Sequence, residues 1–406
     1  MQIRHIFIPI FLLFLLIISR FSWSAIDNET ASVVFAEQSS GLFATKPFVV
    51  FATGALVPFL WFLGNPAKSL GYLPVSIYFF ALASVTWSFD TSTTLFSSMM
   101  LLMVFCYPFL AVKLLGPRLA TLLFWMVGVI VIIASIALAA VGDTHALMGS
   151  NHFFSWRGLF GHKNVFGPFL ATNIIISVFA WRIMGVPRII CWSVAILDAF
   201  ALSMSRSTTP IIGLAIGLSA SLVFIPIVSR QMRYIWIACT LSVTALGAFL
   251  FVTNIEATFE FFGRDPTMTN RTLLWGQVFD LTYQHRLGTG FGTGGGSQVS
   301  IEAQKLFRRK DSIGIQSGYL TGILELGWAI IALYVAWILA IVGKLLTSDR
   351  VRQGQQMVVA TLVFHSLYSV SESAGLIQPS WSLSVCMLAL SVCFRPDTQQ
   401  SDTTEL

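Results

Sequence analysis

The sequence contains few charged residues. Asp, Glu, Lys and Arg make up only 10% of its 406 residues, whereas an ordinary soluble domain has about 25%. Apolar residues make up 56% of the chain, and the mean hydropathy is +0.79. This composition excludes a soluble enzyme, a disordered chain and a coiled coil.

Cysteine is also scarce, and its spacing is uninformative. The chain has five cysteines, with no CxxC pair and no metal-type spacing, which excludes a disulfide framework and a zinc site. We interpret them as small lipid-facing or core residues, because they fall within or at the ends of apolar runs.

No repeat of solenoid period occurs, and no paired broken spans suggest the inverted repeats of a secondary transporter. The net charge of +6 does not by itself indicate nucleic acid, because in a membrane protein the position of charges matters more than their sum.

Long apolar runs recur along the whole chain and predict an all-α polytopic membrane protein with about 12 transmembrane helices. The first run could instead be a signal peptide, since Ser22-Trp23-Ser24 after it resembles a cleavage site. The predicted spans are 5–21, 47–63, 71–88, 93–112, 119–141, 165–181, 189–204, 210–228, 234–252, 319–341, 355–371 and 381–394.

These spans divide the chain into four predicted regions. Residues 1–252 hold transmembrane helices 1–9 with short loops, and 253–318 form one long extracytoplasmic loop with short amphipathic helices. Residues 319–394 hold helices 10–12, and 395–406 form a cytoplasmic tail. With both ends inside, twelve Lys and Arg residues fall on the inner side and five in short outer loops. The positive-inside rule therefore predicts that the long loop is outside. The outer segments also contain most of the side chains that could take part in catalysis or binding.

The segment 155–169, SWRGLFGHKNVFGPF, joins the fifth predicted span to the sixth. Arg157, His162 and Lys163 arrive there with Asn164, a candidate N-cap, just before an apolar helix. A helix N-terminus with nearby cations can bind an anion. The alternative is an interfacial turn whose basic groups meet lipid phosphates.

Arg206 lies between two spans in the segment SMSRSTTP, with almost no loop to carry it into water. A cation at that depth costs about 2.5–3.5 kcal/mol on insertion scales, so we expect an anionic partner unless the side chain reaches the outer interface. Asp198, eight residues earlier on the same helix, could be that partner or part of a polar cavity.

The long loop contains an expected amphipathic helix over 270–284. Arg264 and Arg271 can both present forked donors to phosphate. Trp275 could stack on a sugar ring, although an interfacial tryptophan is the commoner explanation. The string GFGTGG at 290–295 matches a dinucleotide fingerprint formally, but no βαβ unit surrounds it. We expect a mobile loop or a hinge there.

Two ionisable residues, Glu325 and His365, fall within predicted spans, and Glu372 lies just past the end of the span 355–371. Ionisable groups inside a membrane are functional candidates by default. The two carboxylates could instead be structural partners that neutralise Arg206. No carboxylate pair has a spacing that identifies a glycosidase, and no Ser-His-Asp or HExxH pattern occurs.

Four motifs in order resemble a known family. They are RGLFGHKN before a span, SRS at a span end, GR…NR…W in a late outer loop followed by GTGFG, and SGYL…ELG opening the next span. The set resembles the O-antigen ligase/polymerase superfamily, and within it the ExoQ-type branch of exopolysaccharide polymerases. The resemblance covers roughly residues 150–330 and, by span count, the whole chain.

The resemblance implies a bacterial inner-membrane glycosyltransferase that acts at the periplasmic face on glycan linked to undecaprenyl diphosphate. It implies that arginines bind the diphosphate and stabilise it as the leaving group, without metal or other cofactor. It also implies that membrane lipids, a chain-length regulator and a flippase are partners. The residues that it places at the diphosphate are Arg157, Arg206, Arg264 and Arg271, and further substrate contacts would come from His162, Lys163, Asn164, Trp275, Gln316, Ser317 and Tyr319.

The chain departs from this family at one position. Ligases of the superfamily usually have a His-Asn or similar pair just before the last loop re-enters the membrane, where this chain has Gln316 and Ser317. That puts a histidine-dependent ligase role in doubt and leaves the general base open among His285, Glu325 and Glu372. The sequence favours a polymerase, with a ligase that transfers glycan to lipid A core or protein, and a lipid-glycan flippase or transporter, as alternatives. A non-catalytic assembly subunit would not need arginines at such depths.

Overall fold

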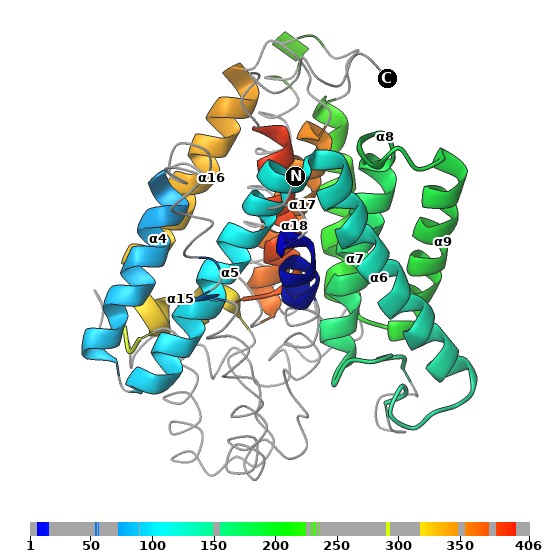
Figure 1. Cartoon of the computed structure of the whole chain (residues 1–406), viewed down its shortest axis with the longest axis horizontal. Helices are drawn as coiled ribbons and strands as arrows, with labels where there is room; N and C mark the ends of the chain where they lie inside the picture. The colour runs from blue at the N-terminus through cyan, green and yellow to red at the C-terminus, as the bar shows by residue number, and fades with distance from the viewer. Residues whose placement is uncertain are drawn as a thin grey trace, which may run out of the picture.

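The computed structural model describes residues 6–15, 72–88, 90–148, 155–224, 290–292, 317–347, 354–372 and 379–394, with a few single residues between them. All regular elements in these ranges are helices, apart from one isolated antiparallel bridge between Leu147 and Trp156. The helices stand side by side as a bundle (Figure 1). This agrees with the predicted all-α class. The number of spans and the long loop stay predictions, because parts of both lie outside the described residues.

The described helices follow the predicted spans closely along most of the chain. Four of them are long and apolar enough to cross a membrane: α5 (Thr91–Leu115), α6 (Pro117–Ala140), α9 (Arg188–Ser205) and α16 (Ala329–Thr347). The others are shorter, namely a helix at Ile6–Leu15, α4 (Tyr72–Ala83) with η1 (Ser84–Trp87), α7 (Lys163–Phe179), α8 (Trp181–Met184), α10 (Thr208–Ser221) with η3 (Leu222–Phe224), α15 (Gly318–Leu326), α17 (Gln355–Ser371) and α18 (Trp381–Cys393).

The predicted span 319–341 is wrong in one respect, because the structure divides it into two helices. α15 ends at Leu326, and Gly327 takes a positive φ of 69° before α16 begins at Ala329. Glycine takes that conformation without the steric cost that a Cβ brings. Glu325 therefore lies in the last turn of a short helix, next to a break, and not inside one continuous span as predicted.

The carbonyl groups freed by this break are bonded to the glycine-rich segment. The N–H groups of Phe291 and Gly292 donate to the carbonyls of Leu324 and Glu325 at 2.7 and 2.8 Å. Gly290 and Gly292 have positive φ, and a Cβ at Gly290 would lie 2.5 Å from the Glu325 backbone. Where a mobile loop or hinge was expected, residues 290–292 are packed closely against the end of α15.

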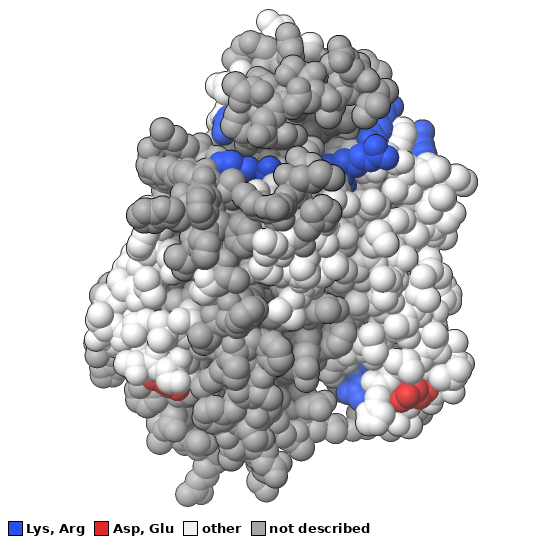
Figure 2. All heavy atoms as spheres, in the orientation of Figure 1, with Lys and Arg blue, Asp and Glu red and all other residues white. Residues whose placement is uncertain are grey.

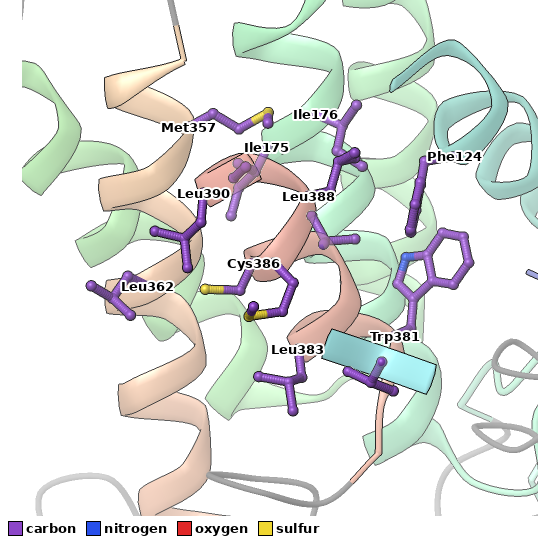
Figure 3. Close-up of a cluster of buried hydrophobic side chains, with 14 of the residues drawn as sticks. Phe124, Ile175, Ile176, Met357, Leu362, Trp381, Leu383, Cys386, Leu388 and Leu390 are labelled. Carbon is purple, nitrogen blue, oxygen red and sulfur yellow. The ribbon is translucent and has the colours of Figure 1, made fainter. Parts of the chain in front are cut away.

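The core lies where α18 packs among α5, α7 and α17. Trp381, at the start of α18, is 2% exposed, and its ring lies 5.4 Å from that of Phe124 and 4.8 Å from that of Phe169. Figure 3 shows leucines and Cys386 of α18 facing isoleucines of α7 and side chains of α17. These contacts hold α7 and α17 in fixed positions relative to each other.

Among the described residues on the visible face, the charged side chains lie toward the two ends of the bundle, and the residues between them are uncharged (Figure 2). At one end Arg118 Nε donates to the carbonyl of Met184 at 3.2 Å, so the start of α6 lies beside the end of α8. At the same end the Arg182 guanidinium lies 4.8 Å from the ring centre of Trp181. Basic residues beside aromatic rings are typical of a membrane interface. The opposite end, where α7 begins, carries the candidate site.

Candidate functional site

A cluster of polar side chains forms where α7 and α10 begin and α17 ends. Asn164 Nδ2 donates to Glu372 Oε1 at 3.0 Å, although the two residues are 208 positions apart in the chain. Ser207 Oγ donates to Asn164 Oδ1 at 3.3 Å. Asn164 therefore joins three helices through one amide group. We call the set the Asn164 cluster; its members are His162, Asn164, Ser207, Tyr368 and Glu372.

The first turn of α7 is closed by His162. His162 is the N-cap, and its Nδ1 accepts from the Asn164 N–H at 3.1 Å. Its carbonyl accepts from Val165 and Phe166 at 3.0 and 3.2 Å. The prediction that Asn164 is the N-cap is wrong: His162 satisfies the backbone donors, which frees the Asn164 side chain to reach Glu372. Since three N–H groups at this terminus are already bonded, anion binding here would depend mainly on side chains.

Two residues at the end of α17, one turn apart, form hydrogen bonds with Asn164. The Tyr368 hydroxyl donates to the Asn164 carbonyl at 2.5 Å, while Glu372 accepts from the Asn164 side chain. Tyr368 is 2% exposed and Glu372 is 8% exposed. Tyr368 lies in the last turn of α17 and Glu372 is its C-cap with an extended backbone, so the end of α17 fixes both the backbone and the amide of Asn164. The Glu372 carboxylate consequently has one defined orientation.

Arg206 sits in a strained turn beside this cluster. It is the C-cap of α9, with φ 52° and ψ 29°, and among the described residues it is the only non-glycine with positive φ. Left-handed backbone of this kind costs about 1–3 kcal/mol, and it occurs often at functional sites. The Arg206 side chain is exposed, as expected if it reaches the outer interface. The next residue, Ser207, is bonded to Asn164.

Asp198 is not at the end of α9 with Arg206. It is fully buried, and its Oδ2 accepts from Asn173 Nδ2 of α7 at 2.7 Å. Of the two interpretations that the sequence left open for Asp198, the structure favours a buried polar contact over a partner for Arg206.

Arg157 organises the loop that precedes α7. Its Nε and Nη1 donate to the carbonyls of His145 and Gly161 at 3.0 Å each, and its Nη2 contacts the Thr144 carbonyl at 3.5 Å. The Trp156 N–H donates to the Met204 carbonyl at 3.1 Å, which ties this loop to the last turn of α9 near Arg206. Several of the five guanidinium donors are thus engaged with backbone, so Arg157 has a structural role whatever else it binds.

Glu325 lies on α15, which packs against α16 and α17. Glu325 is 2% exposed in the last turn of α15. Ser317 is the N-cap of α15, and the Tyr319 hydroxyl donates to the Ser366 carbonyl of α17 at 3.1 Å. His365 is fully buried, with Nδ1 3.2 Å from Ser382 Oγ of α18. These contacts give Ser317, Tyr319 and His365 structural roles in helix packing.

Five predicted site residues lie outside the described residues, so their roles stay predictions: Arg264, Arg271, Trp275, His285 and Gln316. Two members of the Asn164 cluster were not predicted. Tyr368 could have been found from its position four residues before Glu372, near the end of the same predicted span. Ser207 lies within the SRS motif, but no local pattern shows that its partner is Asn164.

Fold and site together define a class of protein: a helical membrane protein that presents a fixed carboxylate, an amide and the exposed cation Arg206 at one end of its bundle. Comparison with known proteins gives a closer description. Residues 193–335 match the O-antigen ligase family. Over 240 residues the chain is 27% identical to the exopolysaccharide production protein ExoQ of Rhizobium meliloti (strain 1021). The aligned region covers 55% of this chain and 51% of that protein. The chain thus aligns with about half the length of this curated relative. Both matches confirm the resemblance that the motifs predict, and they support a role in membrane polysaccharide processing.

Proposed function

We propose that the chain is a polysaccharide polymerase of the bacterial inner membrane. It would transfer a growing glycan from its undecaprenyl-diphosphate carrier to a hydroxyl group at the non-reducing end of the next lipid-linked repeat unit. The observation that carries this proposal is the Asn164–Glu372 contact, which holds a carboxylate at the helix ends where Arg206 is exposed. A carboxylate and a cation are the two groups that glycosyl transfer from a diphosphate needs.

In this proposal the acceptor hydroxyl attacks the anomeric carbon, and the bond from that carbon to the diphosphate oxygen breaks. The bonding electrons leave with the diphosphate, and the hydroxyl proton passes to the Glu372 carboxylate. Arg206 and Lys163 stabilise the departing diphosphate, with Arg264 and Arg271 of the long loop as further candidates. Guanidinium groups would supply the charge that Mg²⁺ supplies in many phosphate-handling enzymes.

The charge distribution supports one orientation of the site. The proposal puts the Asn164 cluster at the periplasmic face, because the opposite end carries basic residues of the kind that face the cytoplasm. A flippase would then deliver the lipid-linked repeat units to this face, and a chain-length regulator would set the polymer size. His162, Trp275, Gln316, Ser317 and Tyr319 stay candidate contacts to the glycan.

The proposal is tested with two substitutions at Arg206. Arg206→Gly keeps the left-handed turn but removes the cation, and Arg206→Lys keeps the cation but removes the forked donors. We expect Arg206→Gly to abolish high-molecular-weight polysaccharide and to leave single repeat units on undecaprenyl diphosphate. Arg206→Lys should retain partial activity. The measurements are the size distribution of cell-surface polysaccharide and the extracted lipid-linked intermediates.

The matched control is Arg188→Gly, at the opposite end of the same helix. Arg188 lies near the rings of Trp181 and Trp192, at the end assigned to the cytoplasm. This variant should leave polymer length unchanged if it reaches the membrane in normal amounts. Unchanged long polymer from Arg206→Gly would refute the role of Arg206 at the diphosphate.

A ligase is the second candidate, and the description of the matched family favours it. The two activities leave different lipid-linked pools in a deletion strain. Loss of a polymerase leaves single repeat units on the carrier, whereas loss of a ligase leaves long polymer on the carrier. No change in either pool would contradict both and would favour a transporter.

A further inference from the structure

A buried pair of polar side chains lies midway along α7 and α9, away from the Asn164 cluster. Asn173 and Asp198 are both fully buried and are joined by the Nδ2–Oδ2 hydrogen bond of 2.7 Å. The other oxygen of each group, Asn173 Oδ1 and Asp198 Oδ1, has no hydrogen-bond partner among the described residues. Buried polar atoms are nearly always paired, so two orphaned acceptors on one contact need a cause.

Within the described part of the chain, no countercharge lies close enough to hold an ionised carboxylate at Asp198. Among the described residues of the elements packed around it, namely α6, α7, α8 and α9, the only other charged side chains are close to helix ends. On α6, Gly128 faces the side chain of Asn173, and Arg118 precedes it by ten residues. On α7 and α9, Lys163 precedes Asn173 by ten residues and Arg188 precedes Asp198 by ten. At 1.5 Å per residue each lies about 15 Å away along its helix. Arg182 and Arg206 lie beyond the ends of α7 and α9. A buried carboxylate without a partner takes up a proton in preference to remaining charged.

One proton on Asp198 satisfies both orphaned atoms. A carboxylic acid and a primary amide form a ring of two hydrogen bonds: the amide N–H donates to one acid oxygen, and the acid O–H donates to the amide oxygen. The first bond is present as Asn173 Nδ2–H to Asp198 Oδ2. The second would run from Asp198 Oδ1–H to Asn173 Oδ1, which are the two atoms left without partners among the described residues.

A glycine of α6 leaves space for the side-chain amide of Asn173. A Cβ on Gly128 would overlap Asn173 Oδ1 and lie 2.9 Å from its Cγ, so only glycine fits opposite the amide. A hard metal ion such as Mg²⁺ or Ca²⁺ takes six or more oxygen ligands, whereas a proton needs only two. The two unpaired oxygen atoms of Asn173 and Asp198 therefore fit a proton and not a metal ion.

We propose that Asp198 is a proton-binding site within the membrane, and that the neutral acid–amide ring it forms with Asn173 sets the register of α7 against α9. Those helices also carry Asn164 and Arg206, nine residues before Asn173 and eight after Asp198. The ring thus acts as a positioning device for the two ends that meet at the Asn164 cluster. The proton assignment stands by itself, and its effect on activity rests on the proposed function.

The test uses the full chain in lipid nanodiscs and four variants. Asp198→Asn keeps a neutral group that can pair with the amide, Asp198→Leu and Asn173→Leu remove the pair, and Asn173→Asp with Asp198→Asn exchanges the two groups. Infrared difference spectra at neutral pH should show a protonated-carboxyl C=O band in the wild type that Asp198→Asn loses and Asn173→Leu shifts. Asp143→Asn, which changes an aspartate bonded to a backbone N–H in an exposed turn, is the control that should leave that band unchanged.

Thermal unfolding and polymer length give the second readout. Asp198→Asn and the exchanged pair should unfold within a few degrees of the wild type and make long polymer, while the two leucine variants should unfold several degrees lower. Absence of the protonated-carboxyl band would overturn the proposal. So would an Asp198→Asn variant as unstable as Asp198→Leu, or unfolding that Na⁺ stabilises in the wild type alone, because each would show that the negative charge is needed. If the proposed polymerase activity failed, the spectrum and unfolding results would be unaffected.

Discussion

The contact between Asn164 and Glu372 predicts a separable effect on stability and on activity. In Asn164→Asp a second carboxylate would face Glu372 Oε1, where the amide now donates at 3.0 Å. The lost hydrogen bond to a charged group is worth about 1.5–3 kcal/mol. Two carboxylates about 4 Å apart repel by about 4 kcal/mol at an effective dielectric constant of about 20.

The pair can relieve part of this repulsion by binding one proton. We therefore expect the free energy of unfolding to fall by about 2–4 kcal/mol. At about 2 °C per kcal/mol for a large domain, the unfolding midpoint should drop by about 4–8 °C. The assay is thermal unfolding of the purified protein in nanodiscs. Gln356→Glu, which adds the same charge near the opposite end of α17, is the control and should change the midpoint less.

The double variant Asn164→Asp with Glu372→Gln separates packing from chemistry. The amide introduced on α17 would then donate to the carboxylate introduced on α7, so the unfolding midpoint should return close to that of the wild type. Polymer synthesis should stay at least about a hundredfold lower, because a general base contributes about 10²–10⁴ to rate and the carboxylate has left its position. A double variant that polymerises normally would refute the role of Glu372 as base. A double variant as unstable as Asn164→Asp would refute the complementary contact.

Two further predictions follow from single contacts. Gly292→Ala would put a Cβ 2.6 Å from the Ser88 Cβ at a φ of 93°, so we expect the free energy of unfolding to fall by about 2–4 kcal/mol. Gly343→Ala has open space around its Cβ and should not destabilise, and equal unfolding midpoints for the two variants would contradict the close packing at Gly292. Tyr368→Phe removes the hydrogen bond to the Asn164 carbonyl and should lower stability by about 1 kcal/mol, with a loss of polymer length if Asn164 shifts. The same unfolding and polysaccharide assays check it, and a wild-type result in both would show that the bond is dispensable.

Helix positions were predictable where a single helix fills one long apolar run. α17 begins and ends where the span 355–371 was expected, because its boundaries coincide with changes in hydropathy that any window detects. The break at Gly327 was missed, since a short polar interruption inside a hydrophobic run does not change the average. What makes the break stable is the backbone pairing with Phe291 and Gly292, and a contact between distant segments leaves no trace in local composition.

The same reasoning applies to the candidate site. Asn164 was singled out as a candidate N-cap, and Glu372 was singled out as an ionisable group at the end of a predicted span. Their contact was not predicted, because it depends on how α7 and α17 pack against α18. The N-cap of α7 was misassigned because Asn is a better cap than His by intrinsic preference. In the structure the amide of Asn164 gains a carboxylate partner, and the imidazole takes over the cap.

The attachment of residues 290–292 to α15 has a consequence for how the long loop can vary. A chain segment fixed near its middle behaves as two shorter loops, and each closes at a smaller entropic cost than the undivided segment would. Within the predicted loop 253–318, the part before the attachment contains Arg264 and Arg271, and the part after it contains Gln316. Insertions or exchanges in one half need not disturb the other, so the two halves could diverge separately while the bundle stays the same.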